Sequence, residues 1–349
     1  MVQQTFDIPK HIQSDEQLEE FVSRPTPELV QSMARLKGDI LILGIGGKLG
    51  PDLARLALRA VHQAGIYKTI YGVSRFSTPG MKKHLSQLGV ETIQADLLEA
   101  DALAKLPDVE NVIFLIGRKF GTRGAESFTW AWNTYLPGLV ADRFRQSKIV
   151  VLSSGNVYPF VPVTSGGADE SILPEPLGEY GQSVLGRERM FEYFSRQYET
   201  PVVLIRLNYA NSLRYGILLD IAQKIIRGTP IDLTTGAVNA VWQGDANTYI
   251  LRSFEIAASP PAILNLTGPE TISVRWLARE LGSRIGKEPI FEGQESDTAL
   301  LNNASFCFGK FGYPKVPLTK MIDWISYWVT HGGSTLDKPT HFEEREGKF

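Results

Sequence analysis

Residues 38–60 contain the feature that most restricts the fold of this chain. They read GDILILGIGGKLGPDLARLALRA, so that an apolar strand passes into an amphipathic helix through four glycines in seven positions. Three of the glycines are spaced three residues apart, and Pro51 follows at an early helical position, where its missing N–H costs little. Backbone N–H groups at such a turn can bind a pyrophosphate, which side chains would block. The residues predicted to bind it are Gly44, Gly47, Lys48, Leu49 and Gly50.

Up to residue 208, short apolar runs alternate with amphipathic segments of helical length. The runs are ILILG, KTIYGV, VETIQAD, NVIFLIG, KIVVLSS and PVVLIRLN. Strands that are apolar on both faces are typical of a parallel sheet with helices on both sides. We therefore predict an α/β fold, with a Rossmann-type doubly wound parallel sheet and an NAD(P)-binding domain over 38–208.

The remaining segments flank this domain. Residues 1–37 predict an N-terminal helical extension, in which Ser14 caps one helix and Thr26 with Pro27 opens a second. After residue 208 the alternation fades, and 209–335 predicts a smaller C-terminal α/β lobe that binds the substrate. Residues 336–349 are polar and charged, and we expect a surface tail.

Composition excludes several classes of function. The 36 basic and 38 acidic residues leave a net charge of −2 without long one-sign blocks, which argues against nucleic acid or an anionic membrane as partner. Cys307 is the single cysteine, no apolar run approaches the roughly 18 residues of a membrane span, and the start lacks leader features, so a cytoplasmic location is expected. The histidines show no metal-ligand spacing, and no metal site is predicted.

The end of the second apolar run bears on cofactor choice. An acidic residue about 20 positions after the glycines usually binds the ribose hydroxyls of NAD, whereas an arginine accommodates the 2′-phosphate of NADP. Here the strand ends in Ser74 and Arg75, with no acid. Arg75 predicts a preference for NADP over NAD, unless it is only a solvated loop charge.

The motifs, taken in order, resemble the extended short-chain dehydrogenase/reductase superfamily, and within it the NAD-dependent epimerase/dehydratase family. The resemblance runs from Asp39 to Trp328 and rests on GIGGKLG, the AD at 95–96, LIGRKFG, WNTYLPG, VLSSGNVY and EYG. It implies that Asp96 and Leu97 lie against the adenine. Further cofactor contacts are implied for Ile116, Gly117, Lys119 and Ser153. Asn133 would orient the cofactor, or serve only as a buried cap.

The same resemblance implies the reaction centre. Ser154 and Tyr180 match the serine and tyrosine that face the substrate hydroxyl in this superfamily, but the lysine expected four residues after the tyrosine is Val184. A free tyrosine has a pKa of about 10, and a nearby cation favours its ionised form. The sequence offers Arg118, Lys119 and Arg187 as other cations, beside the oxidised nicotinamide itself.

These observations predict an NAD(P)-dependent oxidoreductase or epimerase that acts on a secondary alcohol of a sugar, sugar acid or polyol. Two alternatives stay open: a catalytically weak dinucleotide sensor, and a dehydratase or lyase that uses the cofactor transiently. Arg214 and Tyr215, in NYANSLRYGILLD, would bind a carboxylate or hydroxyls of the small-molecule substrate, or merely cap a helix. By resemblance, the chain is expected to form a homodimer through 125–145 and 178–197, where Phe128, Trp130 and Trp132 lie.

Overall fold

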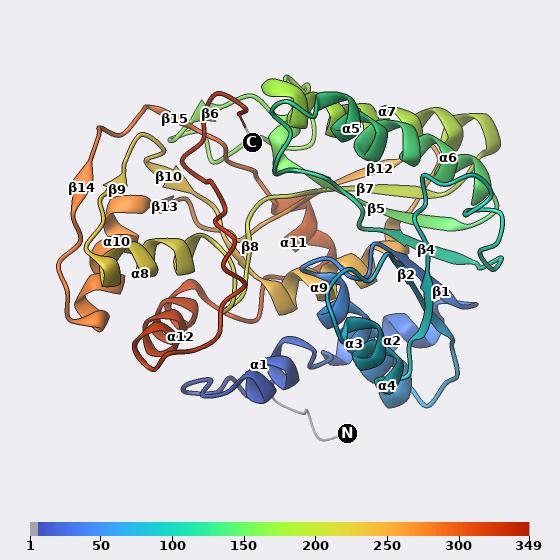
Figure 1. Ribbon diagram of the computed structural model, residues 1–349, viewed down its shortest axis with the longest axis horizontal. Coiled ribbons are helices and arrows are strands. Elements are labelled where there is room, and N and C mark those ends of the chain that lie inside the picture. The colour runs from blue at the N-terminus through green and yellow to red at the C-terminus, as the bar shows by residue number, and fades with distance from the viewer. Residues whose placement is uncertain (1–5, 349) are drawn as a thin grey trace.

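A seven-stranded parallel sheet forms the centre of the computed structural model. The structure describes residues 6–348. Residues 1–5, which begin the N-terminal stretch considered for leader features, and residue 349 lie outside this range. The strand order is β12-β7-β5-β4-β1-β2-β3 (Figure 1). The strands are β1 (Ile40–Leu43), β2 (Ile70–Ser74), β3 (Glu91–Gln94), β4 (Asn111–Phe114), β5 (Lys148–Ser154), β7 (Val202–Leu207) and β12 (Ala262–Leu266). Every pairing among them is parallel, which confirms the predicted doubly wound sheet.

Helices cover both faces of this sheet because its strands are apolar on both faces. In β1, Ile40 and Ile42 face one core and Leu41 and Leu43 face the other, as the two-residue period of a strand requires. The first core is closed by α2 (Pro27–Arg35), α3 (Gly50–Gln63), α4 (Met81–Gln87), α9 (Gln243–Arg252) and α11 (Ser305–Phe311). The second is closed by α6 (Leu136–Arg143) and α7 (Gly178–Tyr198), with α5 (Glu126–Trp130) and a π-helical stretch (Ala131–Tyr135) preceding α6.

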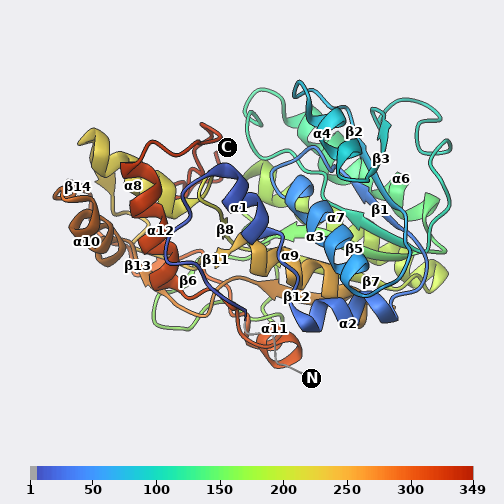
Figure 2. The same cartoon turned by 90° about the horizontal axis from the view of Figure 1, so that it is seen from below.

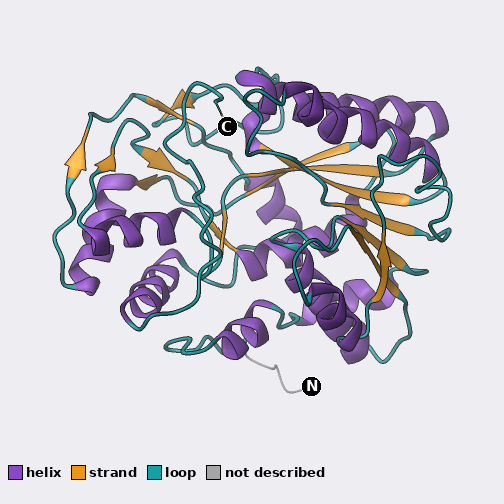
Figure 3. Cartoon of the chain, viewed as in Figure 1, coloured by secondary structure: helices purple, strands orange, loops and turns teal. Residues whose placement is uncertain are grey.

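A smaller lobe stands beside the sheet and has its own core (Figure 3). Its helices are α8 (Ile217–Arg227), α10 (Val274–Ile285) and α12 (Leu318–Thr330), together with α1 (Asp15–Val22) from the N-terminal segment. Two-residue strands connect them: β6 (Val161–Pro162), β8 (Ala210–Asn211), β9 (Ile231–Asp232), β10 (Ala237–Val238), β11 (Val241–Trp242), β13 (Ile272–Ser273), β14 (Phe291–Glu292) and β15 (Thr298–Ala299). Two short 3₁₀ turns lie at Gly155–Val157 and Ser253–Ile256.

The lobe is not the continuous segment 209–335 that the sequence predicted. Within that range, β12 returns to the main sheet and pairs with β7, and α9 packs against α2 and α3. The reason is that β12 is an apolar strand whose partner lies about 60 residues earlier in the chain, which its own pattern cannot reveal. The chain therefore passes between sheet and lobe several times.

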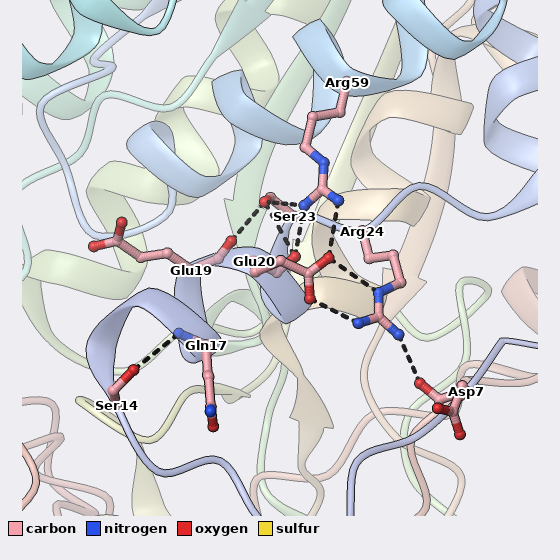
Figure 4. A network of polar contacts seen from close by, with 8 residues as sticks. All are labelled: Asp7, Ser14, Gln17, Glu19, Glu20, Ser23, Arg24 and Arg59. Atoms are coloured by element: carbon pink, nitrogen blue, oxygen red, sulfur yellow. Dashed lines mark hydrogen bonds and ion pairs between the residues drawn. The ribbon is translucent and has the colours of Figure 1, made fainter.

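The N-terminal helix α1 is held to α3 by a polar network (Figure 4). Its start follows the prediction, since the Gln17 N–H donates to the Ser14 hydroxyl at 3.3 Å. At its end, the Arg59 guanidinium from α3 donates to the Glu20 carbonyl oxygen at 2.6 Å and to the Glu20 carboxylate at 2.9 Å. Arg24 binds the same carboxylate at 2.7 Å. The extension is thereby fixed to the helix that begins at the glycine-rich turn.

The C-terminal segment, residues 336–348, runs between the lobe and the sheet and is called here the C-terminal strap (Figures 1 and 2). Composition suggested a polar surface tail, but Thr340 is 3% and Phe342 is 1% exposed. Thr340 is buried because its N–H and hydroxyl donate to the Asp220 carboxylate at 2.8 and 2.6 Å. Polar residues can be buried at little cost when they are hydrogen-bonded in this way.

Candidate active site

A cavity of about 440 Å³, called here the inner cavity, lies at the carboxyl ends of the central strands. In open α/β sheets this edge is where ligands bind, at the point where the strand order reverses. Most of the residues predicted from sequence line it: Gly44, Gly47, Lys48, Leu49 and Gly50 from the turn after β1, Gly117 and Lys119 after β4, Ser153 and Ser154 at the end of β5, and Tyr180 in α7.

A second cavity of about 370 Å³ adjoins it toward β2 and β3. The two share the glycine-rich turn and the loop after β4, including Gly44, Gly47, Gly117 and Lys119. Ser74, Arg75, Leu97 and Ile116 line only this adjoining cavity. Together the two cavities form an elongated cleft centred on the glycines, which fits the extended shape of a dinucleotide.

The three glycines of the turn are required for different structural reasons. Gly44 has a φ of +89°, and a Cβ there would lie 2.8 Å from the Ile116 side chain. A Cβ on Gly50 would lie 2.1 Å from the Ile45 carbonyl oxygen, so α3 could not approach β1 so closely. A Cβ on Gly47 would meet only the Gly44 carbonyl oxygen, at 3.3 Å. Packing therefore explains Gly44 and Gly50, whereas at Gly47 the approach of a ligand to the backbone is the better reason.

Arg75 and Asp96 lie together at the far end of the adjoining cavity. Arg75 is 3.8 Å from the Asp96 carboxylate, and its guanidinium carbon is 4.8 Å from the centre of the Trp132 ring. Asp96 also accepts a hydrogen bond from the Leu98 N–H at 3.1 Å and is not among the residues lining either cavity, unlike its neighbour Leu97. Arg75, half-exposed, is thus the cation at this end of the cleft.

Asn133 braces the loop after β4 from within the protein. Its side-chain oxygen accepts from the Arg118 N–H at 2.8 Å, and its amide donates to the Arg118 carbonyl at 2.9 Å and to the Ser183 hydroxyl at 3.0 Å. It is fully buried and lines neither cavity. Of the two roles considered, the structural one accounts for all of these contacts, and it positions Gly117 and Lys119 indirectly.

Ser154 and Tyr180 both line the inner cavity and are hydrogen-bonded to each other. The Ser154 hydroxyl donates to the Asn156 side-chain oxygen at 3.0 Å and accepts from the Asn156 N–H at 3.2 Å. Burial raises the pKa of Tyr180, and the Arg187 charge and a hydrogen bond with the Ser154 side chain oppose that rise. Tyr180 therefore holds its proton at neutral pH, beside a serine hydroxyl.

The hydroxyl of the neighbouring Ser153 binds a buried carboxylate. Its hydroxyl donates to the Glu188 carboxylate at 2.5 Å, and Glu188 forms an ion pair with Arg206 at 2.8 Å, in which both side chains are 2% exposed. Ser153 thus helps to satisfy a buried ion pair that ties β5 to α7 and β7. A buried pair of this kind needs such extra hydrogen bonds to offset the loss of hydration.

Position 184 carries no cation, and the packing around it is apolar. Val184 is fully buried in a cluster with Val157, Tyr158 and Leu300. Arg187, almost one helical turn further along α7, is also buried and lines the inner cavity.

The Arg187 guanidinium is held in place by two acceptors. It donates to the Leu152 carbonyl at 2.6 Å and to the Asn133 side-chain oxygen at 3.1 Å. Burial lowers its pKa to about 10, while the negative charges of ionised Tyr180 and of Glu188 act in the opposite direction. Arg187 is therefore charged at pH 7 and electrostatically coupled to Tyr180.

Two lysines at the cleft are strongly affected by burial. Burial and the charges of Lys119 and Lys338 lower the pKa of Lys48 to about 7, and burial lowers that of Lys119 to about 8. The Lys48 ammonium lies 3.4 Å from the centre of the Tyr215 ring, and that of Lys119 lies 5.8 Å from the Tyr180 ring. A nearby anionic ligand would stabilise the charged form of each lysine.

The sequence analysis did not identify several residues that line the inner cavity. Tyr209 has a φ of +48°, which is rare for a non-glycine residue and is often found at functional sites. Lys338 and Thr340 reach the inner cavity from the strap, far from any motif. Of the predicted pair near 214, Tyr215 lines the inner cavity, whereas Arg214 pairs with Asp15 and Glu19 at 3.5 Å outside it.

Two kinds of site are absent from residues 6–348. No three His, Cys, Asp or Glu side chains gather there as a set that could hold a metal ion. No helix in that range is long and apolar enough to cross a membrane.

Residues 40–215, just over half of the chain, match the NAD dependent epimerase/dehydratase family. The chain belongs to this family. The match begins at β1 and extends through the glycine-rich turn, Ser154 and Tyr180, so the cleft described above is largely built from it. A comparison with curated protein sequences returned no significant match.

Solved structures share the family fold at low sequence identity. UDP-glucuronic acid 4-epimerase from Bacillus cereus, in complex with UDP-glucuronic acid and NAD, is 18% identical with a TM-score of 0.68, covering 83% of this chain and 98% of that one. UDP-glucose 4-epimerase from Thermotoga maritima, with UDP-glucose, is 15% identical with a TM-score of 0.68 and coverages of 83% and 98%. The Thermus thermophilus UDP-glucose 4-epimerase, in complex with NAD, is 17% identical with a TM-score of 0.68 and coverages of 85% and 100%. At these identities the likeness establishes the fold.

Proposed function

We propose that this member of the family is an NAD(P)-dependent oxidoreductase or epimerase that acts on a secondary alcohol of a sugar, sugar acid or polyol. The observation that carries the proposal is the meeting of Tyr180 and Ser154 in the inner cavity, which opens onto the glycine-rich turn. A bound nicotinamide dinucleotide supplies a hydride acceptor, so that an alcohol held there can be oxidised to a ketone.

Gly44, Gly47 and Gly50 form the turn that would hold the cofactor pyrophosphate, and the open backbone at Gly47 fits it. Arg75, at the far end of the adjoining cavity, favours the 2′-phosphate of NADP, although Asp96 partly neutralises it at 3.8 Å. The solved relatives named above with a cofactor contain NAD, so a direct comparison of the two cofactors decides this point.

In the proposed mechanism, Ser154 hydrogen-bonds the reacting oxygen and Tyr180 exchanges its proton. In oxidation the tyrosinate accepts the proton of the alcohol, and in reduction the neutral phenol donates it to the carbonyl oxygen. Since burial raises the pKa of Tyr180, the neutral donor predominates at pH 7 and reduction is favoured there. Arg187 stabilises the tyrosinate that oxidation requires.

A second candidate function is a dinucleotide sensor with little turnover. The buried, apolar setting of Val184 favours it, because this position carries no cation for Tyr180. The difference between the two candidates lies in Tyr180, which a sensor does not need for binding.

Tyr180→Phe tests the proposal, with Tyr193→Phe as a matched control on the exposed side of the same helix. Turnover of reduced cofactor with ketoses and keto acids should fall about 100- to 10,000-fold in the first variant and stay unchanged in the second. Dinucleotide binding should persist in both. Full turnover in a folded Tyr180→Phe variant, or no turnover in the wild type with any such compound, would contradict the enzymatic proposal.

A further inference from the structure

The C-terminal strap is fixed to the lobe along its length. The Leu336 N–H donates to the Arg214 carbonyl oxygen at 2.9 Å, and Thr340 makes the two hydrogen bonds to Asp220 described above. Further along, the Lys224 ammonium pairs with the Glu343 carboxylate at 2.5 Å. These contacts give the strap a defined path over the cleft.

The end of the strap is anchored beside β15 and the residues that precede β6. The Arg345 guanidinium donates to the Thr298 carbonyl oxygen at 2.8 Å and lies 4.2 Å from the centre of the Phe160 ring. On the sheet side, the rings of His341 and Phe120 are 5.4 Å apart, and Phe120 belongs to the loop after β4. The strap therefore bridges both parts of the molecule.

The strap lines two cavities. Lys338 and Thr340 line the inner cavity, while Lys338, Pro339 and His341 line an outer cavity of about 500 Å³ on the lobe. Lys338 lines both cavities. A substrate that reaches Ser154 and Tyr180 is thus bounded by the strap.

The size of the inner cavity limits that substrate. Sites for drug-sized ligands measure roughly 300–1,000 Å³. The 440 Å³ here include the space over the glycine-rich turn, part of which the cofactor needs. Because the cofactor takes part of this volume, we expect the remainder to accommodate a monosaccharide rather than a sugar joined to a nucleoside diphosphate.

The charges that reach the inner cavity are all positive. They belong to Lys119, Arg187 and Lys338, and in part to Lys48, whose pKa is about 7; within residues 6–348 no carboxylate lines this cavity. A pyrophosphate carries two negative charges and is bound largely by backbone N–H groups at such a turn. Nearby carboxylates do exist behind the lining: Asp220, which is bonded to Thr340, acts on Lys48, and Glu344 acts on Lys119.

We propose, resting on the function proposed above, that the substrate is a free monosaccharide acid without a nucleotide, and that Lys338 of the strap binds its carboxylate. The Lys338 side chain is exposed and lines both the inner and the outer cavity. A strap anchored at both ends can therefore present it to a ligand without further ordering of the backbone.

The test uses the full chain loaded with whichever of NAD and NADP binds more tightly. Calorimetry measures binding of D-glucuronate, D-galacturonate and D-gluconate, each compared with D-glucose, D-galactose or sorbitol, and of UDP-glucuronate. We expect the free acids to bind in preference to both the neutral sugars and the nucleotide sugar. In Lys338→Met the affinity for the acid should fall at least about tenfold, the loss of a charge-assisted hydrogen bond, while Lys338→Arg should retain it.

Three results would overturn this inference while leaving the proposed function intact: tighter binding of UDP-glucuronate than of glucuronate, no binding of any free acid to the loaded protein, or an equal loss of dinucleotide and acid affinity in Lys338→Met. The last would assign Lys338 to the cofactor. Failure of the wild type to bind either dinucleotide would instead overturn the proposed function, and with it this inference.

Discussion

The coupling between Arg187 and Tyr180 gives the sharpest prediction. Arg187→Met removes a buried charge that opposes the rise in the pKa of Tyr180. An opposite charge close to an ionisable group shifts its pKa by about 1–3 units, and each unit corresponds to about 1.4 kcal/mol. The pKa of Tyr180 should therefore rise further above its usual value. Because oxidation needs the tyrosinate, its rate at pH 8 should fall about 10- to 1,000-fold, with the alkaline rise moved to higher pH.

Loss of charge must be separated from loss of structure. Methionine also removes the side-chain donor to the Leu152 carbonyl and one of the two donors to the Asn133 side-chain oxygen, which still accepts from the Arg118 N–H. A buried acceptor that is left unsatisfied costs about 1–3 kcal/mol. Arg187→Lys keeps the charge but not the two-pronged geometry, so it should lose stability while its pH profile changes little. Arg189→Met, on the exposed face of the same helix, controls for the substitution itself.

The assay is the rate of cofactor reduction between pH 6 and about 10.5, with thermal melting to confirm folding. Titration of the ultraviolet absorbance of tyrosinate, as the difference between each protein and its Tyr180→Phe counterpart, gives the same pKa without a substrate. If folded Arg187→Met has the pH profile of Arg189→Met, the electrostatic coupling is refuted and Lys119→Met becomes the next variant to examine.

Four further outcomes can be measured. Gly47→Val should abolish dinucleotide binding in calorimetry with little change in melting temperature. Gly50→Val should chiefly destabilise the fold, because its Cβ would lie 2.1 Å from the Ile45 carbonyl oxygen. Unchanged dinucleotide affinity in Gly47→Val would contradict the pyrophosphate assignment. Arg75→Ala should weaken NADP more than NAD, and equal losses would argue against a 2′-phosphate site. Burial raises the pKa of Asp52 to about 6, so the folded state binds this proton more tightly than the unfolded state and stability falls as pH rises through 4 to 6. Asp52→Asn should remove that loss and be more stable in urea at pH 7 by about 1–2 kcal/mol after allowance for solvent screening, and a steeper pH dependence would refute this sign. A homodimer through 125–145 and 178–197, where Tyr135 is exposed, should sediment as such at micromolar concentration, and a monomer alone would exclude it.

The sheet could be predicted because each of its strands is encoded locally. Ile40 to Leu43 are all fully buried, and such a run has few alternatives to a central parallel strand. Helix starts were equally local, since Ser14 and Thr26 accept hydrogen bonds from N–H groups three residues ahead.

Strand pairings and burial that depend on residues far apart in the sequence could not be predicted. The run that forms β12 identifies a strand but not its neighbour β7. The polar composition around Thr340 predicts exposure, and only the position of Asp220, 120 residues earlier, reverses it. Hydrogen-bonded burial of this kind depends on geometry that the pattern does not contain.

The residues of the candidate site could likewise be predicted only in part. Ser154 and Tyr180 follow a strand and open a helix in a recognisable order, and the structure places them in one cavity, although their roles stay predictions. Lys338 lies in no motif, and Tyr209 reaches the cavity from a backbone conformation that its side chain does not favour. Only the folded chain brings these residues to the same place.

The interleaving of sheet and lobe also bears on how the chain can be shortened. A fragment ending at residue 215, where the family match stops, would contain β7 but not β12. The strand VVLIRL would then present unpaired N–H and C=O groups along an apolar edge, which is a template for aggregation. The smallest unit that keeps all seven strands of this open sheet must therefore continue at least to Leu266, past α8.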